Sequence, residues 1–191
     1  MHFNIATLKQ RSWSTIMSNE IPTIDELFSC AINLEKNTEQ LYRKVGRLFS
    51  HDHAVAQFWS HYADEERGHA LYLQRIKDGM DTERLSLAAD YEIMTDAQNC
   101  LFRISQKEVE NIQNLEDAYV LATELENAET NTIFEFIITN FSADELSKSR
   151  KFLRAQLNEH IARLETSLPI KYRSSAARRG LLVVREMAGC L

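Results

Sequence analysis

The sequence predicts an all-α protein, and two observations carry this prediction. The chain has 191 residues but only 5 glycines and 2 prolines, and the prolines, Pro22 and Pro169, lie near its two ends. A β-sandwich or β-barrel would need turn residues about every 8–12 positions. Apolar residues recur at steps of three and four positions over four long segments, which is typical of amphipathic helices. We therefore expect a four-helix bundle.

Composition and net charge argue against several classes of protein. Hydrophobic residues make up 44% and charged residues 26% of the chain, as in ordinary soluble globular proteins. The formal net charge of −6 argues against nucleic acid as the main partner. No apolar run approaches the roughly 20 residues that a transmembrane helix needs. The 3 cysteines are scattered without a C-x-x-C pair, which excludes a rubredoxin-type module and favours a cytoplasmic location.

The first two helices are expected over residues 23–50 and 52–78. Thr23 and Glu26 match a capping box, in which each side chain accepts a hydrogen bond from a free backbone N–H group of the first turn. Gly79 is a helix stop. The predicted inward faces are Phe28, Ala31, Glu35, Thr38, Tyr42, Val45 and Phe49 in the first helix, and Phe58, Tyr62, Glu66, His69, Leu73 and Ile76 in the second.

A second hairpin is expected over residues 114–139 and 142–168. It follows a long crossover, residues 80–113, in which the pattern Thr95-Asp-Ala-Gln98 predicts the start of a shorter helix. Short links within each pair and a long link between the pairs predict the ferritin-like arrangement of two antiparallel hairpins. The predicted inward faces are Tyr119, Ala122, Glu126, Glu129, Ile133 and Phe136, and then Leu146, Leu153, Leu157, His160 and Leu164.

The extent of the helical periodicity also predicts the domain limits. Residues 23–168 are expected to form the bundle. Residues 1–22 show no clear period and are expected to be an irregular N-terminal extension. Residues 169–191 carry five basic residues against one acidic residue and are expected to be a basic C-terminal tail.

The two hairpins match each other at an offset of 91 residues, and the match places polar residues in the predicted core. Glu35 aligns with Glu126, and His69 aligns with His160. Glu66 precedes His69 by three residues, so both face the same side of a helix. Buried carboxylates are costly unless they are paired or bind a cation. Glutamates and histidines from four helices at one level predict a site for two metal ions, and the oxygen-rich donor set favours iron or manganese.

These motifs resemble the rubrerythrin branch of the ferritin-like superfamily, which contains non-haem di-iron proteins. The resemblance covers about residues 23–168. It implies a di-iron centre that reduces peroxide or activates dioxygen, with Glu35 and Glu126 as terminal ligands and Glu66 as a bridge. It further implies His69 and His160 as nitrogen ligands and Glu129 as an additional ligand. The motifs that carry it are Ala31-x-x-x-Glu35, Glu65-Glu66-Arg-Gly-His69-Ala70, Ala122-x-x-x-Glu126-x-x-Glu129 and His160.

The sequence departs from that family at two points. Leu157 stands where the fourth helix should carry a glutamate, so the site is expected to hold two metals asymmetrically, one metal, or none. Because a rubredoxin module is absent, electrons are expected from a separate donor protein. We expect a homodimeric oxidoreductase. The alternatives are a non-catalytic scaffold, a single-metal or iron-handling protein, and helices with ordinary charged faces whose inward phase is displaced by one residue.

Four other residues and Glu65 are expected to have structural rather than metal-binding roles. Tyr42 and Tyr62 are expected to pack in the core, although a tyrosine near a metal centre can also form a radical or donate a hydrogen bond. Glu65 is expected on a charged outer face. Cys30 and Cys100 are expected to be buried thiols.

Overall fold

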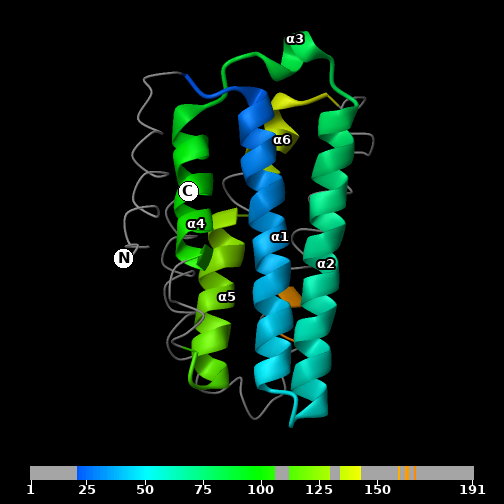
Figure 1. Ribbon diagram of the computed structural model, residues 1–191, viewed down its shortest axis with the longest axis vertical. Helices are drawn as coiled ribbons and strands as arrows, with labels where there is room; N and C mark the ends of the chain where they lie inside the picture. Colours follow the sequence, from blue (N-terminus) through cyan, green and yellow to red (C-terminus); the bar gives the residue numbers. More distant parts are fainter. Residues whose placement is uncertain are drawn as a thin grey trace, which may run out of the picture.

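The computed structural model describes residues 21–105, 112–129 and 134–142, together with the single helical positions 159, 162, 163 and 166. Across this part of the chain the protein is all-α, as predicted, and no strand is present beyond an isolated bridge between Thr23 and Ala88. The helices are α1 (Ile24–Leu48), α2 (His53–Asp78), α3 (Thr82–Leu85), α4 (Tyr91–Ser105), α5 (Leu115–Glu129) and α6 (Glu135–Asn140), arranged as in Figure 1.

Helix α1 begins at the predicted capping box. The Thr23 side chain accepts a hydrogen bond from the Glu26 backbone N–H, and the Glu26 carboxylate accepts one from the Thr23 N–H at 2.8 Å. The residues predicted to face inward are buried from Phe28 to Val45, and Phe49, which follows the helix, is partly buried. The period of 3.6 residues thus identified the inward face of this helix correctly.

Helix α2 follows a short link and runs antiparallel beside α1 (Figure 1). The Asp52 carboxylate caps its start by accepting the Val55 N–H, and Gly79 ends it. At the first position of the predicted inward face, the residue that is fully buried is the next one along the chain. Trp59 is fully buried, whereas Phe58 is only partly buried and packs edge-on against Trp59, with ring centroids 5.1 Å apart. From Tyr62 onward the predicted phase is confirmed for Glu66, Leu73 and Ile76.

Helix α4 starts earlier than predicted. The Asp90 carboxylate accepts the N–H groups of Glu92 at 2.9 Å and Ile93 at 3.1 Å, so the helix begins at Tyr91. Thr95 therefore lies inside the helix, where its hydroxyl donates to the Tyr91 carbonyl at 2.8 Å. The Thr95–Gln98 pattern was a wrong prediction of a helix start, because an acidic cap five residues earlier opens the helix first.

Helix α5 has the predicted start. The Asp117 N–H donates to the Asn114 side chain at 3.0 Å, and the Asn114 N–H donates to the Asp117 carboxylate at 3.2 Å. The sequence predicted a single helix that runs to about residue 139. In this range the structure describes two helices, since α5 ends at Glu129 and α6 begins at Glu135. Residues 130–133 lie outside the described part.

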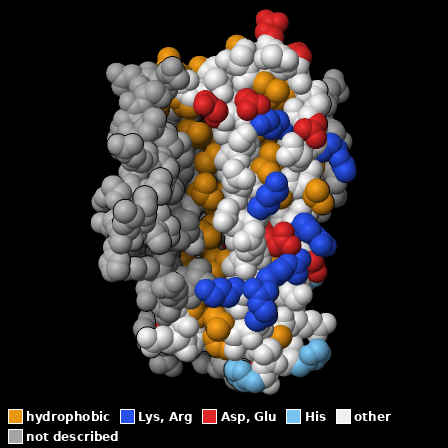
Figure 2. Space-filling view, viewed as in Figure 1, with side chains coloured by type: hydrophobic (Ala, Val, Ile, Leu, Met, Phe, Trp, Pro, Cys, Tyr) orange, Lys and Arg blue, Asp and Glu red, His pale blue; other side chains and the backbone are white. Residues whose placement is uncertain are grey.

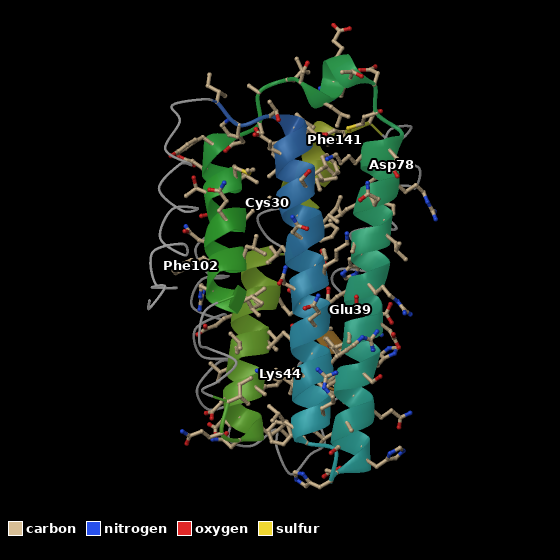
Figure 3. The ribbon with its side chains drawn as sticks, in the orientation of Figure 1. Cys30, Glu39, Lys44, Asp78, Phe102 and Phe141 are labelled. Carbon is tan, nitrogen blue, oxygen red and sulfur yellow. The ribbon has the colours of Figure 1, made fainter. Side chains whose placement is uncertain are left out.

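Helix α6 packs against α1 at the end where α1 begins. The Phe141 and Phe28 rings meet edge to face with centroids 5.5 Å apart. The Arg84 guanidinium lies 4.8 Å from the centroid of Phe141 and donates to the Asn140 carbonyl at 3.1 Å. Figure 3 shows Phe141 beside the first turns of α1.

Helix α1 has α2 on one side and α4 on the other, and it packs against both (Figure 1). Cys30 lies in the layer between α1 and α4, as Figure 3 shows, and both Cys30 and Cys100 are buried, as predicted. Burial, and secondly the nearby Cys100 thiol, raise the pKa of Cys30 to about 11, which keeps this thiol protonated at neutral pH.

The predicted fourth helix falls almost wholly outside the described residues, as do residues 1–20 and the predicted tail 169–191. The four-helix count, the duplication and the domain limits therefore stay predictions. None of the helices described is long and apolar enough to cross a membrane.

Candidate metal centre

The described core is apolar except at four positions. Glu35 and Glu66 are each 1% exposed, Glu126 is 3% exposed, and Thr38 is fully buried. Each of these glutamates stands on a different helix, α1, α2 and α5. A one-residue displacement of the inward phase would have placed these carboxylates in solvent, so for these three helices the alternative of ordinary charged faces is excluded.

Glu35, Glu66 and His69 converge between α1 and α2. Each offers one donor atom, and the three donor atoms lie within 4.8 Å of one another. His69 Nδ1 lies 3.0 Å from Glu66 Oε2 and 3.6 Å from Glu35 Oε2. The spacing of three residues places Glu66 and His69 on adjacent turns of α2, and the packing of α1 against α2 brings Glu35 to the same level.

The chemistry of this group fits a divalent cation. Two buried carboxylates at this separation repel each other, and a cation between them would compensate their charges. Two metal–ligand bonds of about 2.1 Å that meet at about 90–120° separate their donor atoms by about 3.0–3.6 Å, which matches the observed separations from His69. The two separations from His69 are therefore compatible with a shared metal ion.

His69 is the least buried member of the group. Its side chain is 23% exposed, and its ring meets the buried Phe134 ring with centroids 5.6 Å apart. Phe134, which directly precedes α6, thus covers part of the imidazole. The solvent-facing edge of the group lies on the His69 side, since both carboxylates are sealed in the core.

Glu126 approaches α1 from α5 and has a different partner. The Tyr42 hydroxyl donates a hydrogen bond of 2.6 Å to Glu126 Oε1. Tyr42 follows Glu35 by two turns on the same face of α1, so Glu126 contacts the inward face of α1 that also carries Glu35. Among the described residues, Glu126 is not one of the three that converge.

Aromatic rings surround this second carboxylate. The Tyr42 ring lies 5.4 Å from that of Trp59 and 5.9 Å from that of Tyr62, centroid to centroid. Burial, and secondly the charge of Glu126, raise the pKa of Tyr62 far above its usual value, so its phenol stays neutral. Both tyrosines pack in the core, as predicted, and the sequence did not indicate that Tyr42 binds Glu126.

The other predicted ligands are not placed. Glu129 is the last residue of α5 and its side chain lies outside the description, and His160 and Leu157 lie outside the described residues. The protein is thus an all-helical protein with a candidate metal site, Glu35/Glu66/His69. Comparisons of the chain with models of protein families, with curated proteins and with solved structures found no match.

Proposed function

We propose that the protein binds iron through Glu35, Glu66 and His69 and acts as a rubrerythrin-type oxidoreductase of ferritin-like fold on peroxide or dioxygen. One observation carries the proposal. Two carboxylates and an imidazole from two helices converge in the core, with both carboxylates only 1% exposed. Such a group is costly to fold without a cation and gains a stabilising partner when a cation binds.

The donor set favours iron or manganese over copper. Carboxylate oxygens with a single imidazole suit harder divalent ions, whereas copper prefers nitrogen- and sulfur-rich sites. The proposal adds Glu126, Glu129 and His160 as ligands of a second ion. Glu126 is the best supported of these, because it is buried on a third helix and binds Tyr42, which lies two turns after Glu35 on α1.

Bound iron would supply the electrons that cleave the O–O bond of peroxide. The remaining tasks belong to the chain. Glu35 and Glu66 neutralise the charge of the ion, and the apolar core excludes bulk water around them. Tyr42 fixes the orientation of Glu126 through its short hydrogen bond. Phe134 restricts access to His69. The reducing electrons come from a separate donor protein.

A single-metal site is the second candidate. Two observations favour it. Leu157 replaces one expected ligand, and within the part of the chain that the structure describes Glu126 binds Tyr42 and is not one of the three converging residues. A protein with one such ion would handle iron, or the ion would stabilise the fold.

The proposal is tested by metal binding to protein that has been stripped of metal and reloaded with Fe(II) without oxygen. We expect tight binding of two ions per chain for the di-iron site and of one ion for the single-metal alternative. Hydrogen peroxide should then oxidise the bound iron, and a chemical reductant should restore it. Absence of iron and manganese binding by the wild-type protein would overturn the proposal and favour the scaffold.

Two variants localise the site. Glu66→Gln keeps the size of the side chain but removes its charge, and we expect at least a 100-fold weaker affinity for Fe(II). Glu39→Gln is the matched control, because Glu39 lies one turn after Glu35 on α1 and binds Arg43 instead. Equal iron affinity in the two variants would contradict the assignment of Glu66 as a ligand.

A further inference from the structure

Basic side chains lie in a row on the outward side of α1, from its middle to its end. Lys36, Lys44 and Arg47 are exposed, and their spacing places them on one side of a helix with 3.6 residues per turn. No salt bridge joins any of the three to another residue of the part of the chain that the structure describes. Figure 2 shows basic side chains gathered on this face of the molecule. The described part of the chain therefore leaves these positive charges uncompensated.

Two arginines extend this basic surface toward α2. Arg43 contacts Glu39 at 2.8 Å and Asp64 at 3.0 Å, and Arg67 contacts the same Asp64 at 3.3 Å. Five basic side chains thus stand beside two acidic ones, although the whole chain has a net charge of −6. The surface is opposite in sign to the protein that carries it. We call it the basic patch, which consists of Lys36, Arg43, Lys44, Arg47 and Arg67.

The basic patch begins at the level of the candidate metal centre. Lys36 directly follows Glu35 on α1, and Arg67 directly follows Glu66 on α2. Both basic residues are exposed, whereas both carboxylates are buried. A helix with its side chains is about 10–12 Å across. A molecule that binds the patch would therefore lie about one helix diameter from Glu35 and Glu66.

An exposed apolar side chain adjoins the basic patch. Leu48, the last residue of α1, is 48% exposed. It directly follows Arg47 and lies one turn after Lys44, whose position along α1 is shown in Figure 3. Protein interfaces typically combine an apolar contact with a polar rim. The patch thus offers both the charge and the apolar contact that a protein partner would use.

We propose that the basic patch is the docking surface for a small acidic electron carrier, which reduces the iron of the candidate metal centre. The inference rests on the proposed function, which requires a separate donor protein, and it adds the chemistry of that donor and the surface that it binds. Each carrier molecule loses one electron, and each electron converts one bound Fe(III) to Fe(II). Opposite charges accelerate the encounter, and a small interface lets the carrier leave after the transfer.

The charge distribution favours a small protein over a larger polyanion. Nucleic acid and anionic membranes extend far beyond the patch, so the net charge of −6 opposes their approach. A small carrier can contact the patch alone. Charges more distant than a Debye length, about 8–10 Å at physiological ionic strength, then contribute little.

The test uses reduced plant-type [2Fe–2S] ferredoxin, a small acidic one-electron carrier. Stopped-flow absorption without oxygen measures the rate constant with which ferredoxin reduces the iron-loaded protein after oxidation by hydrogen peroxide. Calorimetry measures the binding of oxidised ferredoxin to the metal-free protein. We expect both the rate constant and the affinity to fall as ionic strength rises from about 0.01 M to 1 M, because the Debye length shortens from about 30 Å to 3 Å.

Charge reversal locates the docking surface. The triple variant Lys36→Glu/Lys44→Glu/Arg47→Glu should lower the rate constant and the affinity about 10- to 100-fold at low ionic strength. The difference from the wild type should disappear at about 1 M salt. The variant should still bind Fe(II) and react with hydrogen peroxide as the wild type does, because its three positions are exposed. Circular dichroism verifies that its helices are retained.

A matched pair of single variants separates the patch from the overall charge. Lys44→Glu and Arg75→Glu each replace one exposed positive charge with a negative one. Arg75 lies eight residues after Arg67, which is about 12 Å farther along α2 and outside the patch. We expect Lys44→Glu to lower the rate constant about 3- to 10-fold and Arg75→Glu to change it less.

The outcomes separate this inference from the proposed function. Wild-type rate constants in the triple variant at low ionic strength, or equal effects of Lys44→Glu and Arg75→Glu, would overturn the docking surface and leave the metal site intact. A wild-type protein that ferredoxin does not reduce would also overturn it. So would binding of duplex DNA or phosphatidylserine vesicles that the triple variant loses without a change in its reduction by ferredoxin. A wild-type protein that binds no iron would overturn both proposals.

Discussion

Helix α1 divides at Glu35 into two halves of different chemistry: the buried side chains before Glu35 are all apolar, whereas those from Glu35 onward include polar ones. The first half places Leu27, Phe28 and Leu34 in the core, where Phe28 meets Phe141 edge to face. The second half places Glu35 and Tyr42 at the same depth. Burial of apolar surface contributes about 25 cal/mol per Å² to stability, whereas burial of carboxylates opposes folding. The apolar half thus contributes to the stability of the fold, and the polar half carries Glu35 of the candidate metal site at a cost in stability.

The largest effect should come from the apolar half. Leu27→Ala removes a side chain that is almost fully buried and leaves a cavity, so we expect a loss of about 2–5 kcal/mol in the free energy of unfolding. Urea denaturation of the metal-free protein measures it. Leu71→Ala is the control, since Leu71 is exposed on α2 and should change stability by about 0.5 kcal/mol or less. The comparison fails if the two variants lose equal stability.

The hydrogen bond in the polar half should have an intermediate effect. Tyr42→Phe keeps the ring but removes the hydroxyl that donates to the buried Glu126, so we expect a loss of about 1.5–3 kcal/mol in the free energy of unfolding. The same denaturation measurement applies, with Tyr91→Phe as an exposed control. A loss no greater than that of the control would show that Glu126 does not depend on this donor.

The smallest effect on stability, and one of opposite sign, should come from Glu35. Glu35→Gln removes one negative charge and leaves Glu66 paired with His69 at 3.0 Å. In the presence of a chelator we expect the variant to be as stable as the wild type or more stable by about 1 kcal/mol. With Fe(II) added, the wild type should gain stability and the variant should not. A loss above about 2 kcal/mol in the metal-free protein would mean that Glu35 has a structural role.

Local signals in the sequence predicted much of the fold. The caps at Thr23, Asp52 and Asn114 depend on residues within one turn, and the period of the helix identified the inward faces of α1 and of most of α2. The start of α4 was mispredicted because Asp90 and Thr95 are both good caps, and the sequence does not say which one acts. Helix α3 was missed because four residues carry no measurable period.

The candidate site, like the fold, could be predicted from the sequence only in part. Periodicity predicted that Glu35, Glu66 and Glu126 would be buried, because each lies on an apolar stripe. It could not predict that Glu126 would bind Tyr42, or that Glu65 would bind Arg163, because such pairs depend on the rotation and offset of helices that are distant in sequence. The roles of Glu129 and His160 stay predictions.

Backbone hydrogen bonds join the start of α1 to the segment before α4, and they determine how this end of the helix unfolds locally. The Ile24 N–H donates to the Leu87 carbonyl at 2.9 Å, and the Ala89 N–H donates to the Pro22 carbonyl at 2.7 Å. The first N–H groups of a helix have no partner within the helix and are usually the first to exchange with solvent. Here the end of α1 cannot fray unless the segment before α4 detaches with it. The amide hydrogens of Ile24 and Ala89 should therefore exchange together, as one cooperative unit formed by two distant stretches of the chain.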